Sequence, residues 1–229
     1  MPIARSVFRG RHTGSPVYQS YSTTFPANES PMVEDGGWRL GQSTGLVWQN
    51  VKTVGGMCCA SGFIAGSDYD DPIAFRTGIH PTRHYAQGTI FIAGGYGPVN
   101  GHECELHVGG NIAANSIRTY EVLNTPFSAF QLVRWNGALN DVEDIGGTNV
   151  NGGPITPTSG MVIRVEYSIV GGDPLIQYYQ DGVMRLTKSD TDAAKKITSG
   201  QPGLAFFVRT GTGADLEGMG WLDFSCGTF

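Results

Sequence analysis

The sequence has little charge and no long apolar run. Charged residues make up 15% of its 229 residues and the formal net charge is −5, whereas a typical soluble domain has about 25% charged residues. Nucleic-acid binding needs a basic patch or stripe, so this composition argues against nucleic acid as a partner. No apolar run approaches the ~18 residues of a membrane span, and the N-terminus lacks the apolar segment of a Sec signal peptide. We therefore expect a protein made in the cytoplasm without a signal peptide and with no membrane partner.

Cysteine is also scarce, which limits the role of disulfide bonds. The chain has four cysteines, at Cys58, Cys59, Cys104 and Cys226. Disulfides are uncommon in proteins assembled in a cytoplasm, so we expect reduced and mostly buried thiols. A bridge between Cys104 and Cys226 stays open as an alternative.

Segments with the 3.6-residue period of an amphipathic helix are missing, apart from the short candidate Asp190–Lys196. Short apolar runs follow one another instead, separated by turns that hold many of the 34 glycines. This pattern predicts an all-β fold, an antiparallel jelly-roll β-sandwich, and the length suits one such domain of ~200–250 residues. We expect strands near residues 37–40, 46–54, 57–64, 74–78, 85–93, 102–108, 118–123, 129–135, 141–145, 161–168, 175–180, 183–188, 204–209 and 220–225.

The clearest turn signal is the dipeptide Asp181-Gly182, which separates two alternating apolar runs. Both residues tolerate a positive φ, as a two-residue hairpin turn requires. A closing strand, Trp221–Ser225, contains Trp221 and Phe224. We expect both aromatic side chains to be buried, and this strand to pair near the N-terminal strands.

Several motifs carry a resemblance to a known superfamily. The Asp181-Gly182 hairpin, the turn at residues 199–203 and the final Trp-x-Asp-Phe strand resemble the C-terminal half of the concanavalin A-like lectin/glucanase superfamily, in its laminin-G-like bacterial and phage branch. Residues 74–77 with 84–90, and 120–123 with 131–137, resemble further strand pairs of that group. The resemblance covers residues 25–229 and implies the jelly-roll fold. Its motifs are turn glycines and core aromatics, so it implies no particular activity.

Residues 1–24 are basic and lack a sustained period, and we interpret them as an N-terminal arm that precedes the domain at 25–229. Free termini are poorly ordered unless contacts hold them. We expect the arm to contact a neighbouring subunit or another virion or surface protein. The assembly contacts would come from Arg5, Phe8, Arg9, Arg11 and Tyr18.

The best catalytic candidate is the segment at residues 102–108. Strand alternation places Cys104 and Leu106 on one apolar face and Glu103, Glu105 and His107 on the other. Two carboxylates and an imidazole on one face are groups that acid/base chemistry on a polysaccharide requires. Related hydrolases carry Glu-x-Asp-x-x-Glu here and related alginate lyases carry Arg-x-Glu-Leu-Arg, and this chain departs from both. The alternative is a polar strand that faces solvent.

Aromatic side chains on loops are candidates for stacking on sugar rings. The predicted carbohydrate-binding residues are Tyr69, Tyr96, Tyr120 and Arg118. The alternative is that these aromatics cover the edge of the sandwich.

Three aspartates on one predicted loop, Asp68, Asp70 and Asp71, are a candidate site for a structural Ca²⁺, which binds several oxygen ligands. Their spacing lacks the glycine and distal glutamate of an EF-hand loop, and a plain acidic turn is the alternative. We expect no other cofactor.

These observations predict a non-catalytic, lectin-like surface or assembly protein. They fit best a bacteriophage virion accessory protein (capsid decoration, fibre or adhesin). Such a protein would form a homo-oligomer, with polysaccharide as a candidate ligand. The alternative is a polysaccharide lyase or glycoside hydrolase that uses the Glu103, Glu105 and His107 face.

Overall fold

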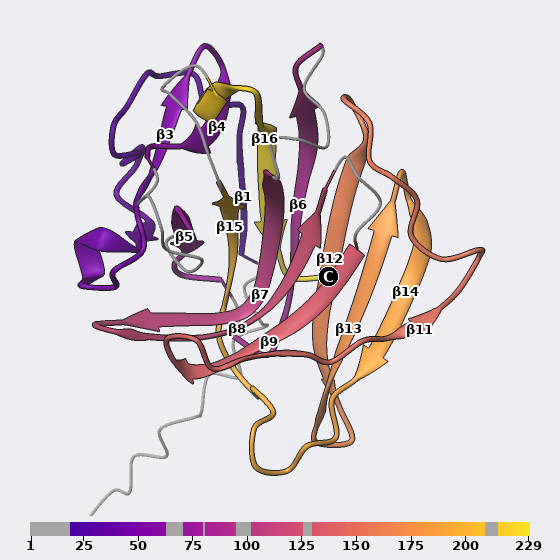
Figure 1. Cartoon of the computed structure of the whole chain (residues 1–229). Coiled ribbons are helices and arrows are strands. Elements are labelled where there is room, and N and C mark those ends of the chain that lie inside the picture. The colour runs from indigo at the N-terminus through magenta and orange to yellow at the C-terminus, as the bar shows by residue number, and fades with distance from the viewer. Residues whose placement is uncertain (1–18, 63–70, 80, 95–101, 126–129, 209–214) are drawn as a thin grey trace, which may run out of the picture.

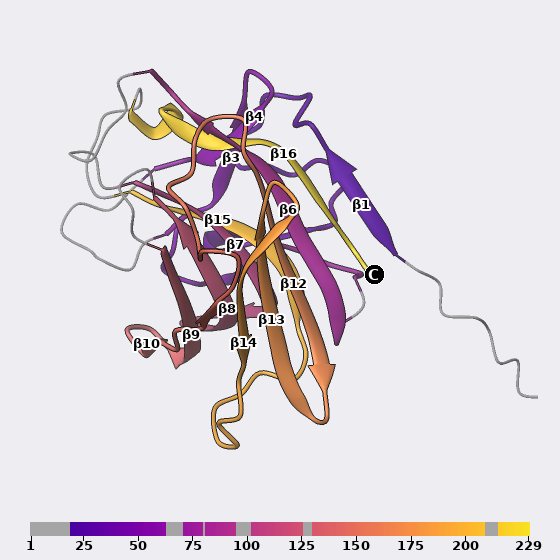
Figure 2. The same cartoon turned by 90° about the vertical axis from the view of Figure 1, so that its right-hand side faces the viewer.

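The computed structural model describes residues 19–62, 71–79, 81–94, 102–125, 130–208 and 215–229. Within these ranges the chain forms a nine-stranded large sheet and a seven-stranded small sheet, which pack face to face (Figures 1 and 2). Every strand pair is antiparallel. The predicted antiparallel jelly-roll β-sandwich is therefore confirmed. No helix in the described ranges has the length and apolar character to span a membrane.

The strand order of each sheet shows how far the chain crosses over between neighbours. In the large sheet the order is β11 (Thr148–Asn149), β14 (Val183–Ser189), β13 (Asp173–Gln180), β12 (Val162–Val170), β6 (Arg83–Ile92), β16 (Met219–Gly227), β4 (Met57–Ala60) and β3 (Val51–Val54), while β1 (Ser20–Thr23) also pairs with β16. In the small sheet it is β10 (Val142–Asp144), β9 (Phe130–Ala138), β8 (Ser116–Asn124), β7 (Glu103–Ala113), β15 (Gln201–Phe207), β5 (Ile73–Arg76) and β2 (Trp38–Leu40). The described residues also contain two short 3-10 turns, η1 (Gln42–Thr44) and η3 (Asp215–Glu217).

The hairpin between β13 and β14 has the predicted turn. Asp181 and Gly182 have φ angles of 47° and 77°, the left-handed pair that a tight hairpin of this type requires. The Asp181 carboxylate also accepts a hydrogen bond from the backbone N–H of Val162 at 2.9 Å. The turn therefore joins β13 to β14 and contacts the start of β12.

The core lies between the sheets because apolar residues alternate along the strands that face each other. Ile163, Val165 and Tyr167 of β12 are fully buried. They belong to one apolar cluster with Leu106 and Val122 of the small sheet. Such burial contributes about 25 cal/mol per Å² of apolar surface removed from water and is the main stabilising term of the sandwich.

Three expectations about local structure are corrected. Asp190–Lys196 forms a single turn, in which the Lys196 N–H donates to the Asp192 carbonyl at 2.9 Å, and no helix follows. The strand expected over 46–54 is extended only over β3. Residues Ser20–Thr23, within the range predicted as the arm, pair in register with Gly227–Phe224 of β16. The arm residues Arg5, Phe8, Arg9, Arg11 and Tyr18 lie outside the described ranges.

The cysteines are all free and buried. Cys104 and Cys226 therefore do not form the alternative disulfide. Burial raises the pKa of both thiols, that of Cys226 to about 12, so they are protonated and unreactive near neutral pH. The expectation of reduced, buried thiols is confirmed.

The predicted burial of the closing strand is also confirmed, since Trp221 and Phe224 are both 0% exposed. We expect Trp221→Ala to lower the free energy of unfolding by about 3–5 kcal/mol, because it removes a large buried ring and leaves a cavity. The neighbouring Leu222 is 36% exposed, so Leu222→Ala is a matched control that should cost much less. Urea unfolding of both variants measures the difference, and equal losses would contradict this assignment.

Candidate functional site

The predicted alternation of β7 is confirmed, and it sends the ionisable side chains away from the sandwich core. Cys104, Leu106 and Val108 face the large sheet as members of the core cluster. Glu105 and His107 point to the opposite face of the small sheet, next to Phe75. Glu103 lies on the same strand and is half-buried.

That opposite face is covered, so the prediction of a solvent-facing strand is wrong. Glu105 is 1% exposed and His107 is 0% exposed. The physical reason is a second apolar cluster on this side of the sheet, which contains Trp48, Phe75 and Trp135. Trp48 comes from the segment expected as a strand, and its indole packs edge-on against Trp135 at a centroid distance of 4.8 Å.

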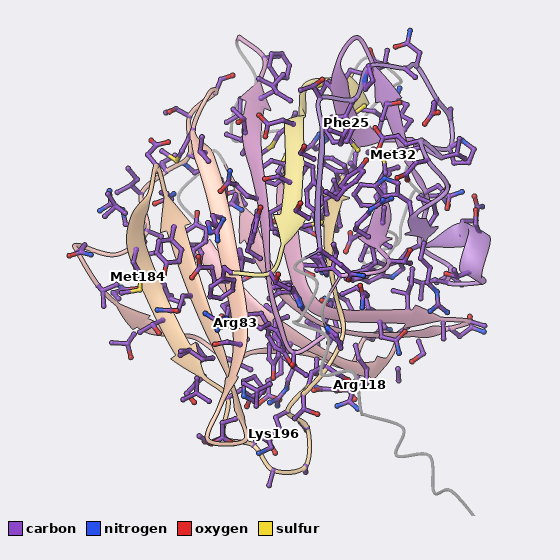
Figure 3. All side chains as sticks on the ribbon, turned by 180° about the vertical axis from the view of Figure 1, so that it is seen from behind. Phe25, Met32, Arg83, Arg118, Met184 and Lys196 are labelled. Carbon is purple, nitrogen blue, oxygen red and sulfur yellow. The ribbon has the colours of Figure 1, made fainter. Side chains whose placement is uncertain are left out.

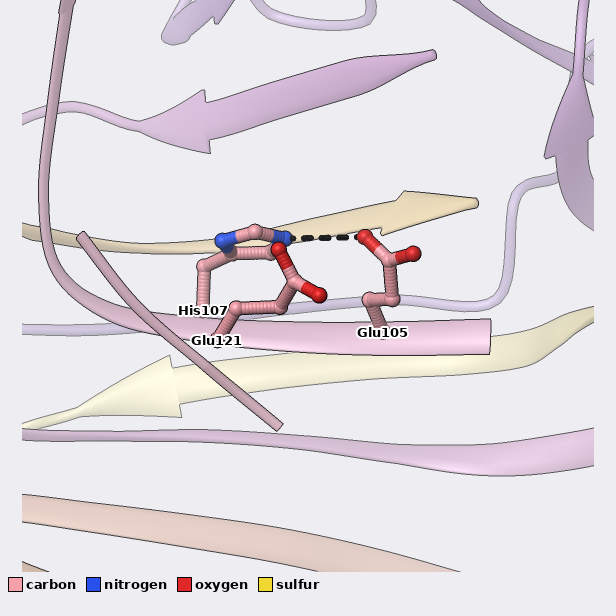
Figure 4. Close-up of side chains that lie close together, drawn as sticks. All are labelled: Glu105, His107 and Glu121. Atoms are coloured by element: carbon pink, nitrogen blue, oxygen red, sulfur yellow. Dashed lines mark hydrogen bonds and ion pairs between the residues drawn. The ribbon is translucent and has the colours of Figure 1, made fainter. Parts of the chain in front are cut away.

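Glu121 of β8 joins the two predicted residues, as Figure 4 shows. It lies directly opposite His107 in the β7–β8 register. One potential ligand atom from each of Glu105, His107 and Glu121 lies within 4.8 Å of the other two. Glu121 was not among the predicted site residues, although the alternation of β8 was a usable signal, since its neighbours Tyr120 and Val122 both face the core.

Two hydrogen bonds orient this cluster of Glu105, His107 and Glu121. The Trp135 indole N–H donates to Glu121 Oε2 at 2.6 Å. His107 Nε2 and Glu105 Oε2 are 3.3 Å apart, a long contact for a hydrogen bond. His107 Nδ1 is buried and has no hydrogen-bond partner.

Burial shifts the pKa values of all three groups toward their neutral forms. It raises the pKa of Glu105 well above its usual range, and the charges of Glu121 and Asp71 add to the effect. It raises the pKa of Glu121 to about 8, against a stabilising hydrogen bond from Trp135. It lowers the pKa of His107 to about 3. Without a bound cation, the cluster is therefore neutral at pH 7.

The predicted carbohydrate-binding residues do not form one site in the described ranges. Tyr120 is 0% exposed, and its hydroxyl donates to Asp190 Oδ2 at 2.6 Å. This corrects its assignment as a stacking residue, because its side chain belongs to the sandwich core. Arg118 is exposed and donates to the Lys195 carbonyl, at the end of the sandwich where Figure 3 labels Lys196. Tyr69 and Tyr96 lie outside the described residues.

The predicted calcium residues are tested only in part. Asp71 is 5% exposed and stands beside Pro72, whose carbonyl accepts a hydrogen bond from the backbone N–H of Phe206 in β15. Asp68 and Asp70 lie outside the described residues. Asp71 is therefore a buried residue next to the small sheet.

A second candidate site is an open groove on the outer face of the large sheet. It has a volume of about 640 Å³ and lies between β1 and the β6–β16 pair. Its floor carries Gln87 opposite Ser225 and Thr89 opposite Asp223. The Thr89 hydroxyl donates to Asp223 Oδ2 at 2.6 Å. The lining thus offers hydroxyl, amide and carboxylate groups side by side.

Comparisons with known proteins identify similar folds and no close relative. No family model matches the sequence, and no curated protein matches it. Among solved structures, a Bacillus subtilis protein described as having a galectin-like fold has a TM-score of 0.57 at 11% identity, over 92% of this chain and 99% of that one. This similarity shows a shared β-sandwich fold.

Two further similar structures come from an enzyme and from a phage protein. An endo-1,3-β-glucanase from Streptomyces sioyaensis has a TM-score of 0.53 at 12% identity, over 94% of this chain and 98% of that one. The CBM2 module of an evolved Dit from Lactobacillus casei BL23 phage J-1 has a TM-score of 0.50 at 10% identity, over 92% of this chain and 96% of that one. Identities this low establish a shared fold alone.

The pKa shifts predict a measurable pH dependence of stability in protein treated with a chelator. The unfolded chain releases the Glu105 and Glu121 protons near pH 4.5, whereas the folded protein keeps them, that of Glu121 to about pH 8. The free energy of unfolding should therefore fall as the pH rises from about 6.5 to 8. Below about pH 6.5 the His107 shift acts in the opposite direction, because only the unfolded chain binds its proton.

Glu121→Gln removes one of these titrating groups and keeps an acceptor for Trp135. The free energy of unfolding should then fall less steeply between pH 6.5 and 8, by up to about 1.4 kcal/mol per pH unit. Urea unfolding at several pH values measures the slopes. Glu166→Gln, on the outer face of the large sheet, is the control and should keep the wild-type slope. Equal slopes for Glu121→Gln and wild type would refute a protonated Glu121 in the fold.

Proposed function

We propose that this protein is a non-catalytic, lectin-like β-sandwich that binds a polysaccharide and acts as a surface or assembly protein. The absence of catalysis is proposed because Glu105 and His107 are buried beneath the second apolar cluster, which contains Trp48, Phe75 and Trp135. A general acid or base must come within hydrogen-bond reach of its substrate. A polymer cannot reach side chains that are 0–1% exposed.

The groove on the outer face of the large sheet is the proposed saccharide site. Sugar hydroxyls require paired donors and acceptors, which Gln87, Thr89, Asp223 and Ser225 provide along its lining. Arg164 approaches the groove from β12, where its Nη1 lies 3.4 Å from Gln87 Oε1. Its guanidinium also stacks on the Tyr85 ring at 3.7 Å. The groove therefore offers fixed polar groups that suit a neutral or weakly charged glycan.

The finer proposal is a bacteriophage virion accessory protein, such as a capsid decoration protein, fibre or adhesin. Three observations support it: the similarity in fold to the phage CBM2 module, the buried free thiols of a protein that needs no oxidising compartment, and the basic segment at residues 1–24. In this proposal the segment contacts a neighbouring subunit or another virion protein.

A polysaccharide lyase or glycoside hydrolase remains the alternative function. Glu121 favours it, because it places a further carboxylate beside the candidate residues Glu105 and His107, while Glu103 is half-buried at one end of the group. The similarity in fold to the glucanase also supports it. This alternative requires the cover over Glu105 to open during turnover.

Binding to immobilised polysaccharides tests the saccharide site. We expect Gln87→Ala to weaken binding of any retained glycan by about 10-fold, since it removes a hydrogen-bonding group worth about 1–1.5 kcal/mol. Gln177→Ala is the matched control, because Gln177 lies on β13 of the same sheet and does not line the groove. Equal binding by both variants would contradict the groove as the site.

Assays of glucans and polyuronates for new reducing ends or unsaturated products test the non-catalytic part. We expect no turnover by the wild-type protein. If turnover occurs and Glu105→Gln abolishes it while the melting temperature is kept, the enzyme alternative replaces the proposal. If binding occurs without turnover, the lectin-like function stands.

A further inference from the structure

The buried cluster of Glu105, His107 and Glu121 has no cationic partner among the described residues. None of the described lysines or arginines forms an ion pair with Glu105 or Glu121. Asp190 offers an internal comparison, since it is also buried, yet it pairs with Arg134 at 2.6 Å. Buried carboxylates are normally paired or coordinate a metal ion.

His107 is a second, independent sign of a missing partner. It is fully buried, with its Nδ1 unpartnered and its Nε2 held only by the long contact to Glu105. Figure 4 shows His107 Nε2 directed toward the Glu105 carboxylate, with the Glu121 carboxylate beside this contact. The long contact leaves Nε2 poorly satisfied, and one explanation is an ion at that nitrogen, which would leave Nδ1 unchanged.

We propose that Glu105, His107 and Glu121 bind one divalent transition-metal ion, with Zn²⁺ as the best fit. One potential ligand atom from each residue lies within 4.8 Å of the others. Zinc binds imidazole nitrogen and carboxylate oxygen at about 2.0–2.2 Å, so two ligand atoms on one tetrahedral ion are about 3.4 Å apart. The 3.3 Å between His107 Nε2 and Glu105 Oε2 already matches this spacing. The Glu121 ligand atom, which lies within 4.8 Å of both, would have to approach to the same spacing.

The donor set selects the class of metal. Imidazole suits zinc and its neighbours, whereas Ca²⁺ and Mg²⁺ prefer six or more oxygen ligands. A single imidazole with two carboxylates, beside the apolar cluster of Trp48, Phe75 and Trp135, therefore favours zinc over the hard cations. Trp135 supplies the outer hydrogen bond that orients the Glu121 carboxylate, as such partners commonly do at metal sites. The ion would hold β7 and β8 together beneath their cover.

Metal titration of the full chain tests the proposal. After EDTA treatment and dialysis, we expect the protein to bind one Zn²⁺ per chain in competition with a chromophoric chelator, and to bind Ca²⁺ far more weakly. Glu105→Gln and Glu121→Gln should each weaken zinc binding by at least ~100-fold, more than the loss of an outer-shell partner costs. Glu166→Gln should bind zinc as the wild type does. Less than one fifth of an equivalent of zinc in the wild type, or equal binding by Glu121→Gln, would overturn the proposal.

A measurement on the wild type alone avoids the risk that a buried variant fails to fold. Crystals soaked in Zn²⁺ should give an anomalous peak at the zinc edge between the Glu105, His107 and Glu121 side chains. A peak only at surface residues would overturn the proposal. The proposed saccharide groove lies on the large sheet, whereas the proposed zinc site lies on the small sheet. A failure to bind zinc can therefore be distinguished from a failure to bind polysaccharide.

Discussion

A β-sheet with both faces covered leaves its polar side chains no route to water, and the small sheet of this protein is such a sheet. One face of β7 and β8 packs against the large sheet, and the other packs beneath Trp48 and Phe75. The loop that carries Trp48 has no partner strand of its own, yet it decides whether the ionisable residues of β7 see solvent. Most properties of the candidate site follow from this cover.

The protein deals with buried charge in two different ways. At one end of the sandwich, Arg134 is 1% exposed and donates to Asp190 and to the carboxylates of Glu143 and Asp192. That network links β9 to the turn after β14, and the Tyr120 hydroxyl joins it. Beneath Trp48, in contrast, two carboxyls and an imidazole share a space without a guanidinium or ammonium partner among the described side chains. Protons or a metal ion must supply the compensation there, because desolvated charges are costly without a partner.

Much of the fold could be predicted from local patterns. The Asp181-Gly182 turn, the alternation along β7 and the burial of Trp221 all depend on the strand period or on turn chemistry, which act over a few residues. Trp48 shows why the rest could not be predicted. Its segment has the composition of a strand. It covers the outer face of the small sheet only because Phe75 of β5 and Trp135 of β9 lie there to pack against it. Glu121 and His107 are likewise brought together by the β7–β8 register, although the alternation of β8 already indicated which way Glu121 points.

The position of β16 has a consequence for how the chain folds. It is the last described strand in chain order, and it lies inside the large sheet with β6 on one side and both β4 and β1 on the other. A ribosome therefore releases nearly all of the sequence before the large sheet can be completed, and until then the edges of β6 and β4 are unpaired. Pairings over such long sequence separations slow folding and expose strand edges to other chains. Until β16 is made, the edges of β6 and β4 that it will cover are sites where one chain can pair with another.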